Sequence, residues 1–404
     1  MSSVFSEISG GINAPAGFLS GSAYCGIKAA NLDRPDVAMI RSVQPAVAAG
    51  TFTTNRVKAA PVRVSAAHLR AADVRVIVAN AGNANACTGV PGIENAKRMA
   101  RAAAQALGLK DRQVLVCSTG RIGVQLPIEK IETTITSLSH SLVSDGSGAA
   151  AAAIMTSDTV RKEIAVEVQL SSGPVHIGGI AKGAGMIDPN MATMLCFLTT
   201  DALIEKAELQ HALSVSVEHS FNRITVDGDM STNDTVLILA NGVAANPALR
   251  SGTDDFERFQ RALDHVTLAL AKMIVDDGEG VTKFVEVHVN GAASFSDARR
   301  ACEAIAKSTL VKCAWFGGDP NWGRIMDALG YSGIKMREEL VDIYYDGVLA
   351  VKGGLASETP AEMLRKLVAE ERFRVTVDLN LGAAEYNVFT TDLSTEYVEL
   401  NMGE

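Results

Sequence analysis

One threonine near the middle of the chain has the surroundings of a rigidly held nucleophile. Thr193 opens a short apolar run, residues 193–198, and follows a glycine-containing segment that begins at Lys182. A short apolar run bounded in this way is typical of a buried strand. A hydroxyl on its first residue would be fixed beside the preceding loop. The alternative is that Thr193 is an ordinary strand residue, because threonine is common in strands.

A threonine hydroxyl needs a base before it can attack a carbonyl group. No His, Asp or Glu is adjacent to Thr193 in the sequence. The α-amine of the same residue, with a pKa of about 7.7–8.0, would suit this work. That amine becomes free only if the peptide bond between Ala192 and Thr193 is cut. An N-to-O acyl shift by Thr193 onto the Ala192 carbonyl, followed by hydrolysis, would cut it, and the sequence permits this step without requiring it.

Acyl transfer also needs donors that stabilise the developing oxyanion. Thr119 and Gly120 directly follow an apolar run at residues 113–117 that we interpret as a strand. A glycine N–H beside a hydroxyl suits this role, since glycine has no Cβ to block the approach of a substrate. A simple turn at the end of the strand is the alternative interpretation.

The elements that would position these residues alternate irregularly along the chain. The patterns predict strands at residues 47–54, 74–79, 113–117, 162–170, 174–180, 193–198, 235–240, 284–289, 341–345 and 373–379. They predict helices at residues 95–107, 127–142, 206–219, 254–274, 296–307 and 360–370. Because the order lacks the regular rhythm of a doubly wound sheet, we expect an α+β (mixed α/β) sandwich.

The composition narrows the class of protein. The chain has 404 residues, 47% of them hydrophobic, and a formal net charge of −9, which argues against nucleic-acid binding. We recognise neither a secretory signal nor a membrane-spanning run of about 20 apolar residues. The six cysteines form no C-x-x-C pair and the histidines show no ligand spacing, so we expect a cytoplasmic protein with reduced thiols and no metal.

Five further motifs, together with the segment around Thr193, resemble one known family. They lie at residues 80–89, 118–120, 221–229, 277–280 and 319–324. In this combination and order they are similar to the ornithine acetyltransferase family, also called glutamate N-acetyltransferase or the ArgJ family of arginine biosynthesis. No single motif would be specific, but five motifs in this order, spread along the whole chain, make a specific match.

The resemblance implies a fold and a reaction. The fold would be an ArgJ/DmpA-like sandwich, cut between Ala192 and Thr193 into chains 1–192 and 193–404 that fold as one unit and assemble as a heterotetramer of two chains of each kind. The reaction would move acetyl from N2-acetylornithine through an acetyl-Thr193 intermediate to glutamate, giving ornithine and N-acetylglutamate without a cofactor. Whether acetyl-CoA also serves as a donor is open, since the sequence contains no nucleotide-binding motif.

The resemblance also implies the site residues. Thr119 and Gly120 would form the oxyanion hole. The substrate contacts it implies are Thr156, Lys182, Thr193, Glu279 and Asn401. Lys182 would meet a carboxylate and Glu279 an ammonium group. From the residues alone, an isolated Lys or Glu is more often solvated, and Asp276 or Asp277 would suit the role of Glu279 equally well.

Two departures from the family pattern keep alternatives open. Arg121 stands where the family often has an apolar residue, and it would either contact an anion or face solvent. The sequence continues for three residues after Asn401, whereas family members commonly run to a terminal Thr or Ser that contacts substrate. The alternatives are an N-terminal-nucleophile amidase or aminopeptidase, a secondary-pathway acyltransferase, and a binding protein that stays uncleaved.

Overall fold

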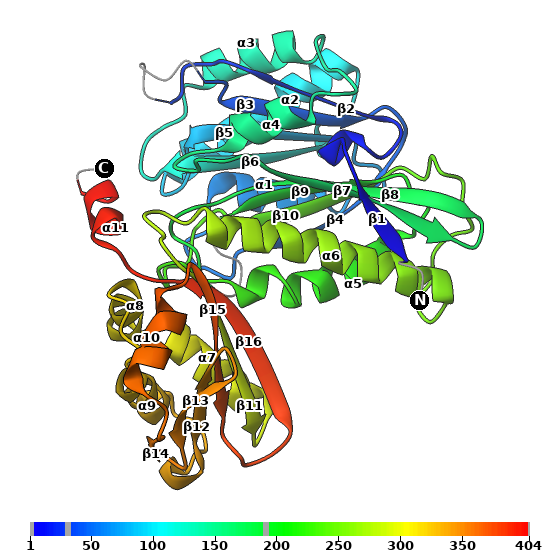
Figure 1. Cartoon of the computed structure of the whole chain (residues 1–404). Helices are drawn as coiled ribbons and strands as arrows, with labels where there is room; N and C mark the ends of the chain where they lie inside the picture. The colour runs from blue at the N-terminus through cyan, green and yellow to red at the C-terminus, as the bar shows by residue number, and fades with distance from the viewer. Residues whose placement is uncertain (1–3, 29–33, 189–193, 403–404) are drawn as a thin grey trace. The chain divides into compact units, whose positions relative to one another are not determined.

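The computed structural model describes residues 4–28, 34–188 and 194–402 (Figure 1). The chain divides into two compact units. Unit 1 comprises Met1–Gly183, Asn190–Asn222 and Met230–Ile274, and unit 2 comprises Ala184–Pro189, Arg223–Asp229 and Val275–Glu404. Because each unit draws on separated segments, residues far apart in the sequence come together inside it. The predicted division into chains 1–192 and 193–404 concerns covalent cleavage and stays a prediction.

A six-stranded sheet forms one layer of unit 1. Its strand order is β1 (Phe5–Ile8), β7 (Lys162–Leu170), β8 (Gly173–Lys182), β9 (Leu195–Thr200), β10 (Thr235–Ala240) and β4 (Val47–Phe52). All neighbours are antiparallel except β9 and β10. Every residue of β9 and β10 is buried, as expected for central strands covered on both faces. The register places Lys182 opposite Leu195.

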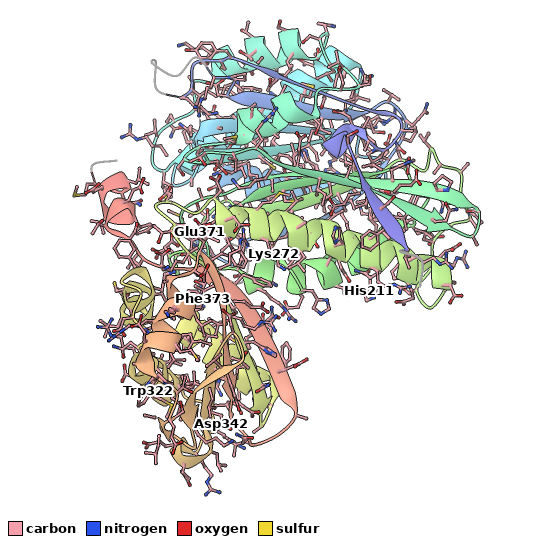
Figure 2. The ribbon with its side chains drawn as sticks, in the orientation of Figure 1. His211, Lys272, Trp322, Asp342, Glu371 and Phe373 are labelled. Atoms are coloured by element: carbon pink, nitrogen blue, oxygen red, sulfur yellow. The ribbon has the colours of Figure 1, made fainter. Side chains whose placement is uncertain are left out.

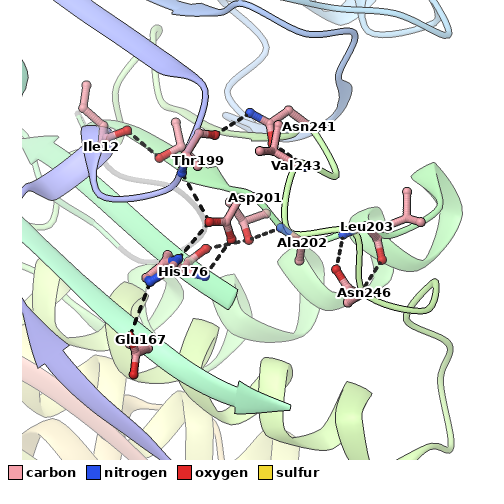
Figure 3. Close-up of polar contacts among 12 residues, drawn as sticks. Ile12, Glu167, His176, Thr199, Asp201, Ala202, Leu203, Asn241, Val243 and Asn246 are labelled. Carbon is pink, nitrogen blue, oxygen red and sulfur yellow. Dashed lines mark hydrogen bonds and ion pairs between the residues drawn. The ribbon is translucent and has the colours of Figure 1, made fainter. Parts of the chain in front are cut away.

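A polar cluster fixes the other end of the β8–β9 pair (Figure 3). The buried carboxylate of Asp201 accepts hydrogen bonds from the backbone N–H groups of His176, at 2.7 Å, and Ala16, at 3.2 Å. It also lies 2.8 Å from Nδ1 of His176, and Thr200 donates to the His176 carbonyl. A slip by one residue would break these contacts and move each side chain to the opposite face of the sheet, so the cluster helps to set the register that brings Lys182 beside Leu195.

A four-stranded sheet forms the second layer of unit 1, in the order β2 (Phe18–Ala23), β3 (Val37–Ser42), β5 (Val76–Asn83) and β6 (Val114–Arg121). Its strands are antiparallel except for β5 and β6, which α2 (Gly89–Leu107) connects. The apolar side chains of the sheet alternate between two cores, one shared with the six-stranded sheet and one shared with helices.

Helices complete four layers in unit 1 (Figure 1). The small, apolar helix α4 (Ser147–Ile154) lies in the core between the two sheets. The outer face of the four-stranded sheet packs against α1 (Ala60–His68), α2 and α3 (Ile128–Leu138). The long helix α6 (Asp254–Asp276) and α5 (Lys206–Glu218) cover the six-stranded sheet. The strand ends near the candidate site are therefore supported by buried layers.

Unit 2 is a six-stranded sheet covered by helices. Its strand order is β14 (Leu355–Ala356), β13 (Val348–Lys352), β12 (Asp342–Tyr345), β15 (Arg372–Asp378), β11 (Phe284–Ala292) and β16 (Ala384–Thr391). The helices are α7 (Phe295–Lys307), α8 (Thr309–Phe316), α9 (Trp322–Tyr331), α10 (Ala361–Ala369) and the final α11 (Thr395–Leu400). Phe373, labelled in Figure 2, packs edge-on against Trp315 in the core at 5.9 Å between ring centroids.

The mixed α/β class predicted from the sequence is confirmed, while several details differ. Strand β6 runs through Gly120 to Arg121 instead of ending at residue 117, and β5 continues to Asn83. Residues 147–154, which carry no helical pattern, form α4. All six cysteines are free, in line with the reduced thiols expected from the sequence; Cys196 is buried, whereas Cys87 and Cys313 are exposed.

Among the residues that the structure describes, no helix is long and apolar enough to cross a membrane. Nor does this part of the chain contain a group of three or more His, Cys, Asp or Glu side chains placed to hold a metal ion.

Candidate active site

Thr119 and Gly120 lie at the end of β6, paired with Ala81 and Gly82 of β5. Gly120 has a φ of 124°, and a Cβ at this position would stand 2.4 Å from the carbonyl carbon of Gly82. Only glycine therefore fits here. Thr119 is buried, whereas Gly120 is exposed. The predicted oxyanion pair is thus located where the sheet ends and a substrate carbonyl could approach the backbone.

Three buried amide and hydroxyl groups hold the end of this strand. Ser118 donates to Oδ1 of Asn80 at 2.6 Å, and Asn80 donates to the Asn83 carbonyl at 2.9 Å. The Asn233 amide donates to the carbonyls of Ala84, at 2.7 Å, and Ser118, at 2.8 Å. The sequence interpretation missed Asn233, because a polar residue just before an apolar strand looks like any turn residue.

The nucleophile and the scissile bond are not part of the described structure. Ala192 and Thr193 lie outside the described residues, so their assigned roles stay predictions. The next residue, Met194, is buried, and its N–H donates to Oδ1 of Asp234 at 3.0 Å. Its carbonyl accepts a hydrogen bond from the N–H of Thr235 at 3.1 Å. The chain just after Thr193 is therefore held firmly.

Thr156 and Lys182, predicted as substrate contacts, come together around Asp158. Lys182 Nζ donates to Oγ1 of Thr156 at 2.6 Å and lies 3.5 Å from the Asp158 carboxylate. Lys162 Nζ lies 2.7 Å from the same carboxylate. Asp158 also accepts hydrogen bonds from the backbone N–H groups of Thr156, at 2.9 Å, and Gly183, at 2.7 Å. We call Thr156, Asp158, Lys162 and Lys182 the lysine cluster.

The lysine cluster is buried and carries excess positive charge. The side chains of Asp158 and Lys162 are 0% exposed and that of Lys182 is 3% exposed. Burial raises the pKa of Asp158, but the ammonium groups of Lys182 and Lys162 outweigh it and hold that pKa well below its ordinary value. Within these four residues, two ammonium groups stand against one carboxylate, which leaves one positive charge in the cluster itself. The cluster is therefore suited to bind an anion.

A third lysine lies close enough to act on this cluster electrostatically. Lys28 Nζ donates to the carbonyls of Pro35, at 3.0 Å, and Ala153, at 3.2 Å. Burial lowers the pKa of Lys28 to about 8, although Asp36 opposes the shift. Neither Lys28 nor Asp158 was singled out from the sequence as a site residue, because the sequence does not show that either one lies near Lys182.

Glu279 and Asn401, the other predicted substrate contacts, meet in unit 2. The Asn401 side chain donates to Oε2 of Glu279 at 2.9 Å, and the Glu279 N–H donates to the Ala184 carbonyl at 3.0 Å. Glu279 is half-buried and Asn401 is exposed. Their approach depends on α11, since Ser394, which caps this helix, donates to the Gly280 carbonyl at 2.6 Å.

The neighbouring acids differ from Glu279. Asp276 ends α6 and lies 2.5 Å from the guanidinium of Arg372, whereas Asp277 is buried. Glu279, by contrast, is paired with a second predicted site residue, which favours it over Asp276 and Asp277 as the substrate contact.

Arg121 is exposed at the end of β6, which agrees with the solvent-facing alternative.

The fold and these residues define a class of protein. It is a mixed α/β enzyme with a buried, positively charged cluster suited to bind an anion, and with a glycine at the end of a strand in a position suited to acyl transfer. The family model described as "ArgJ family" matches residues 20–403. The chain belongs to the ArgJ family. The resemblance that the motifs predicted is thus confirmed.

Individual relatives cover nearly the whole chain. The arginine biosynthesis bifunctional protein ArgJ of Symbiobacterium thermophilum is 45% identical over 394 residues, 98% of each chain. The glutamate N-acetyltransferase of Methanocaldococcus jannaschii is 47% identical over 407 residues, again 98% of each. Among solved structures, the bifunctional protein ArgJ of Bacillus halodurans is 40% identical with a TM-score of 0.50, covering 52% of this chain and 98% of that one.

Proposed function

We propose that this chain is a self-processing acetyltransferase of arginine biosynthesis. It transfers acetyl from N2-acetylornithine to Thr193 and then to glutamate, giving ornithine and N-acetylglutamate. The observation that carries the proposal is the lysine cluster. Its excess charge suits a substrate carboxylate, and Lys182 is paired in register with Leu195, two residues after Thr193. Family membership and the names of the relatives support the same reaction.

The reaction begins with maturation. The Thr193 hydroxyl attacks the Ala192 carbonyl, the amide becomes an ester, and water hydrolyses that ester. The products are chain 1–192, with a new carboxylate, and chain 193–404, with a free α-amine on Thr193. This amine then serves as the general base for the hydroxyl of the same residue.

Acetyl transfer proceeds in two half-reactions. The Thr193 hydroxyl loses its proton to the α-amine and attacks the acetyl carbonyl, and Thr119 and Gly120 stabilise the oxyanion. The C–N bond of N2-acetylornithine breaks, ornithine leaves with the proton, and acetyl-Thr193 remains. The amine of glutamate then attacks this ester, which gives N-acetylglutamate and restores the hydroxyl.

The proposed contacts bind substrate groups of opposite charge. Lys182 and Thr156 bind the α-carboxylate that both substrates carry, while Glu279, oriented by Asn401, binds the side-chain ammonium group of ornithine.

Acetyl-CoA is the second donor that we propose for acetylating glutamate, in keeping with the word "bifunctional" in the names of relatives. We further propose a cytoplasmic heterotetramer of two 1–192 and two 193–404 chains, which native mass spectrometry would test.

The first experiment compares the intact masses of the wild type and Thr193→Ala. The wild type should resolve into two fragments cut between Ala192 and Thr193, while the variant should stay at 42.5 kDa. A wild type that stays whole would refute the N-terminal-threonine mechanism and favour the binding protein. Acetate release from N2-acetylornithine at an undiminished rate without glutamate would instead identify an amidase.

A further inference from the structure

The segment ahead of the proposed scissile bond packs in unit 2, against residues that come after that bond in the sequence. Ala184–Pro189 belongs to unit 2 together with Arg223–Asp229 and Val275–Glu404. Among its described residues, Met186 has a φ of 55°, which is unfavourable for a side chain other than glycine. Such a conformation persists only where the surroundings impose it.

The Asp227 carboxylate supplies the main contact. Its Oδ2 accepts a hydrogen bond from the N–H of Met186 at 2.5 Å, and its Oδ1 accepts one from the N–H of Ile187 at 2.9 Å. Oδ1 also accepts from the Asp229 N–H at 3.1 Å, and the Tyr397 hydroxyl donates to Oδ2 at 3.2 Å. Hydrogen bonds to a carboxylate are about twice as strong as neutral ones. Asp227 therefore fixes two consecutive peptide groups in the strained conformation.

Other contacts hold the next peptide groups. The Ile187 carbonyl accepts hydrogen bonds from the N–H of Val226, at 2.8 Å, and from Oγ1 of Thr225, at 3.0 Å. The Asp188 carboxylate lies 2.7 Å from Lys307 Nζ. The segment is thus anchored up to Asp188, five residues before Thr193.

Anchoring matters because self-cleavage is an intramolecular reaction. The rate of such a reaction depends on how often the hydroxyl and the carbonyl adopt the attack geometry. Fixing the chain at Asp188 reduces the conformations open to the five residues that end at Thr193, whereas a free segment would sample many unproductive ones.

We propose that Asp227 is a positioning residue for self-cleavage, which holds Met186 and Ile187 so that the chain up to Thr193 reaches the attack geometry. The inference rests on the proposed cleavage between Ala192 and Thr193. After cleavage the same contacts join chain 1–192 to chain 193–404, because Met186 and Ile187 belong to the first and Asp227 to the second.

The test is the rate of self-cleavage of freshly synthesised full-length chain, followed by intact mass and gel electrophoresis. Asp227→Asn keeps the size of the side chain but replaces one acceptor oxygen with an amide that cannot accept from a backbone N–H. We expect cleavage at least tenfold slower than in the wild type, with a folded 42.5 kDa precursor accumulating.

Two matched controls use neighbouring residues. The Asp229 side chain is exposed and contributes only its backbone N–H to Asp227, so Asp229→Asn should cleave at the wild-type rate. Tyr397→Phe removes one hydrogen bond from Asp227 but leaves those to Met186 and Ile187, so it should change the rate by no more than about twofold.

The outcomes separate this inference from the proposed function. A wild type that does not cleave refutes the proposed function itself. Cleavage of Asp227→Asn at the wild-type rate, or an equal slowing in Asp229→Asn, overturns the inference alone. If circular dichroism shows that Asp227→Asn does not fold, Thr225→Val decides, since it removes only the hydroxyl contacts to Ile187 and Asp188. Slower cleavage of this variant supports the anchored segment, and an unchanged rate refutes it.

Discussion

The two sets of proposed substrate contacts differ in how they are built. The lysine cluster of unit 1 is buried, and Asp158 ties its charges and two backbone N–H groups together. The Glu279–Asn401 pair of unit 2 is partly or fully exposed, and Asn401 follows a helix of only six residues. A buried cluster of ion pairs and hydrogen bonds is costly to rearrange, whereas an exposed pair can adapt.

This difference matches the chemistry of the proposed substrates. N2-acetylornithine and glutamate share an α-carboxylate but end in an ammonium group and a carboxylate, respectively. A rigid cluster suits the group that both substrates carry. An adaptable pair suits the end that changes between the two half-reactions. The comparison therefore implies that variants of the two sets should fail in different ways.

The largest effect should come from Asp158→Asn. The variant removes the carboxylate that lies beside the buried Lys162 and Lys182, and removing one partner of a buried ion pair costs about 3–5 kcal/mol. We expect the thermal midpoint to fall by roughly 5–10 °C, as measured by calorimetry. Asp276→Asn, which breaks the exposed pair with Arg372, is the control and should cost about 0–1 kcal/mol. Equal losses in both variants would contradict the distinction.

The second effect concerns the two ends of the substrate. Lys182→Met should raise KM about 30-fold or more for both N2-acetylornithine and glutamate, because it removes the partner of their shared carboxylate. Glu279→Gln should lower kcat/KM for N2-acetylornithine about tenfold and affect glutamate much less, since only ornithine carries the ammonium group. Steady-state kinetics of the two half-reactions measures both.

The two substitutions are chosen to separate charge from shape. Glu279→Gln keeps the size of the side chain and an oxygen that can accept a hydrogen bond from Asn401, but it removes the negative charge. Lys182→Met keeps most of the aliphatic length of Lys182 while removing its positive charge. If Glu279→Gln weakened both substrates equally, the assignment of Glu279 to the ammonium group would be wrong.

The sequence predicted local elements better than the site. The spacing of apolar residues predicts the helix at 254–274, found as Asp254–Asp276, and the buried strand at 235–240 is found at the same bounds. Helix α4 was missed because it consists of seven small residues and Ile154, most of them buried, and so lacks an amphipathic pattern.

The polar network could not be predicted for a different reason. Asp158 and Lys182 are 24 residues apart, and Glu279 and Asn401 are 122 apart, so nothing local marks them as partners. The predicted site residues came from the family resemblance, whereas the contacts of Asp158 with Lys182, Asn233 with Ser118 and Asp227 with Met186 appear only when the fold brings distant segments together. Their neighbours in the sequence carry no signal of these contacts.

The smallest effect concerns two buried aspartates whose pKa values shift in opposite directions. In unit 1, the lysines outweigh burial and lower the pKa of Asp158. In unit 2, burial outweighs Lys307 and raises the pKa of Asp188 from 3.8 to about 6, with Glu303 adding to the rise. Between pH 3.8 and about 6, Asp188 is therefore protonated in the folded protein but ionised in the unfolded chain.

The sign of the linkage follows from this difference in bound protons. The contribution of Asp188 to stability is greatest below pH 3.8 and is lost as the pH rises to about 6, whereas that of Asp158 is present above its ordinary pKa and is lost on acidification. Melting curves between pH 4 and pH 7 should thus show the wild type losing about 1–3 kcal/mol relative to Asp188→Asn as the pH rises. The difference between wild type and Asp158→Asn should stay nearly constant over this range and shrink only below about pH 4, because above that pH Asp158 is ionised in both the folded and the unfolded protein. A difference for Asp158→Asn that falls with rising pH, as it does for Asp188→Asn, would mean that the lysines around Asp158 do not lower its pKa, and the contrast between the two units would lose its electrostatic basis.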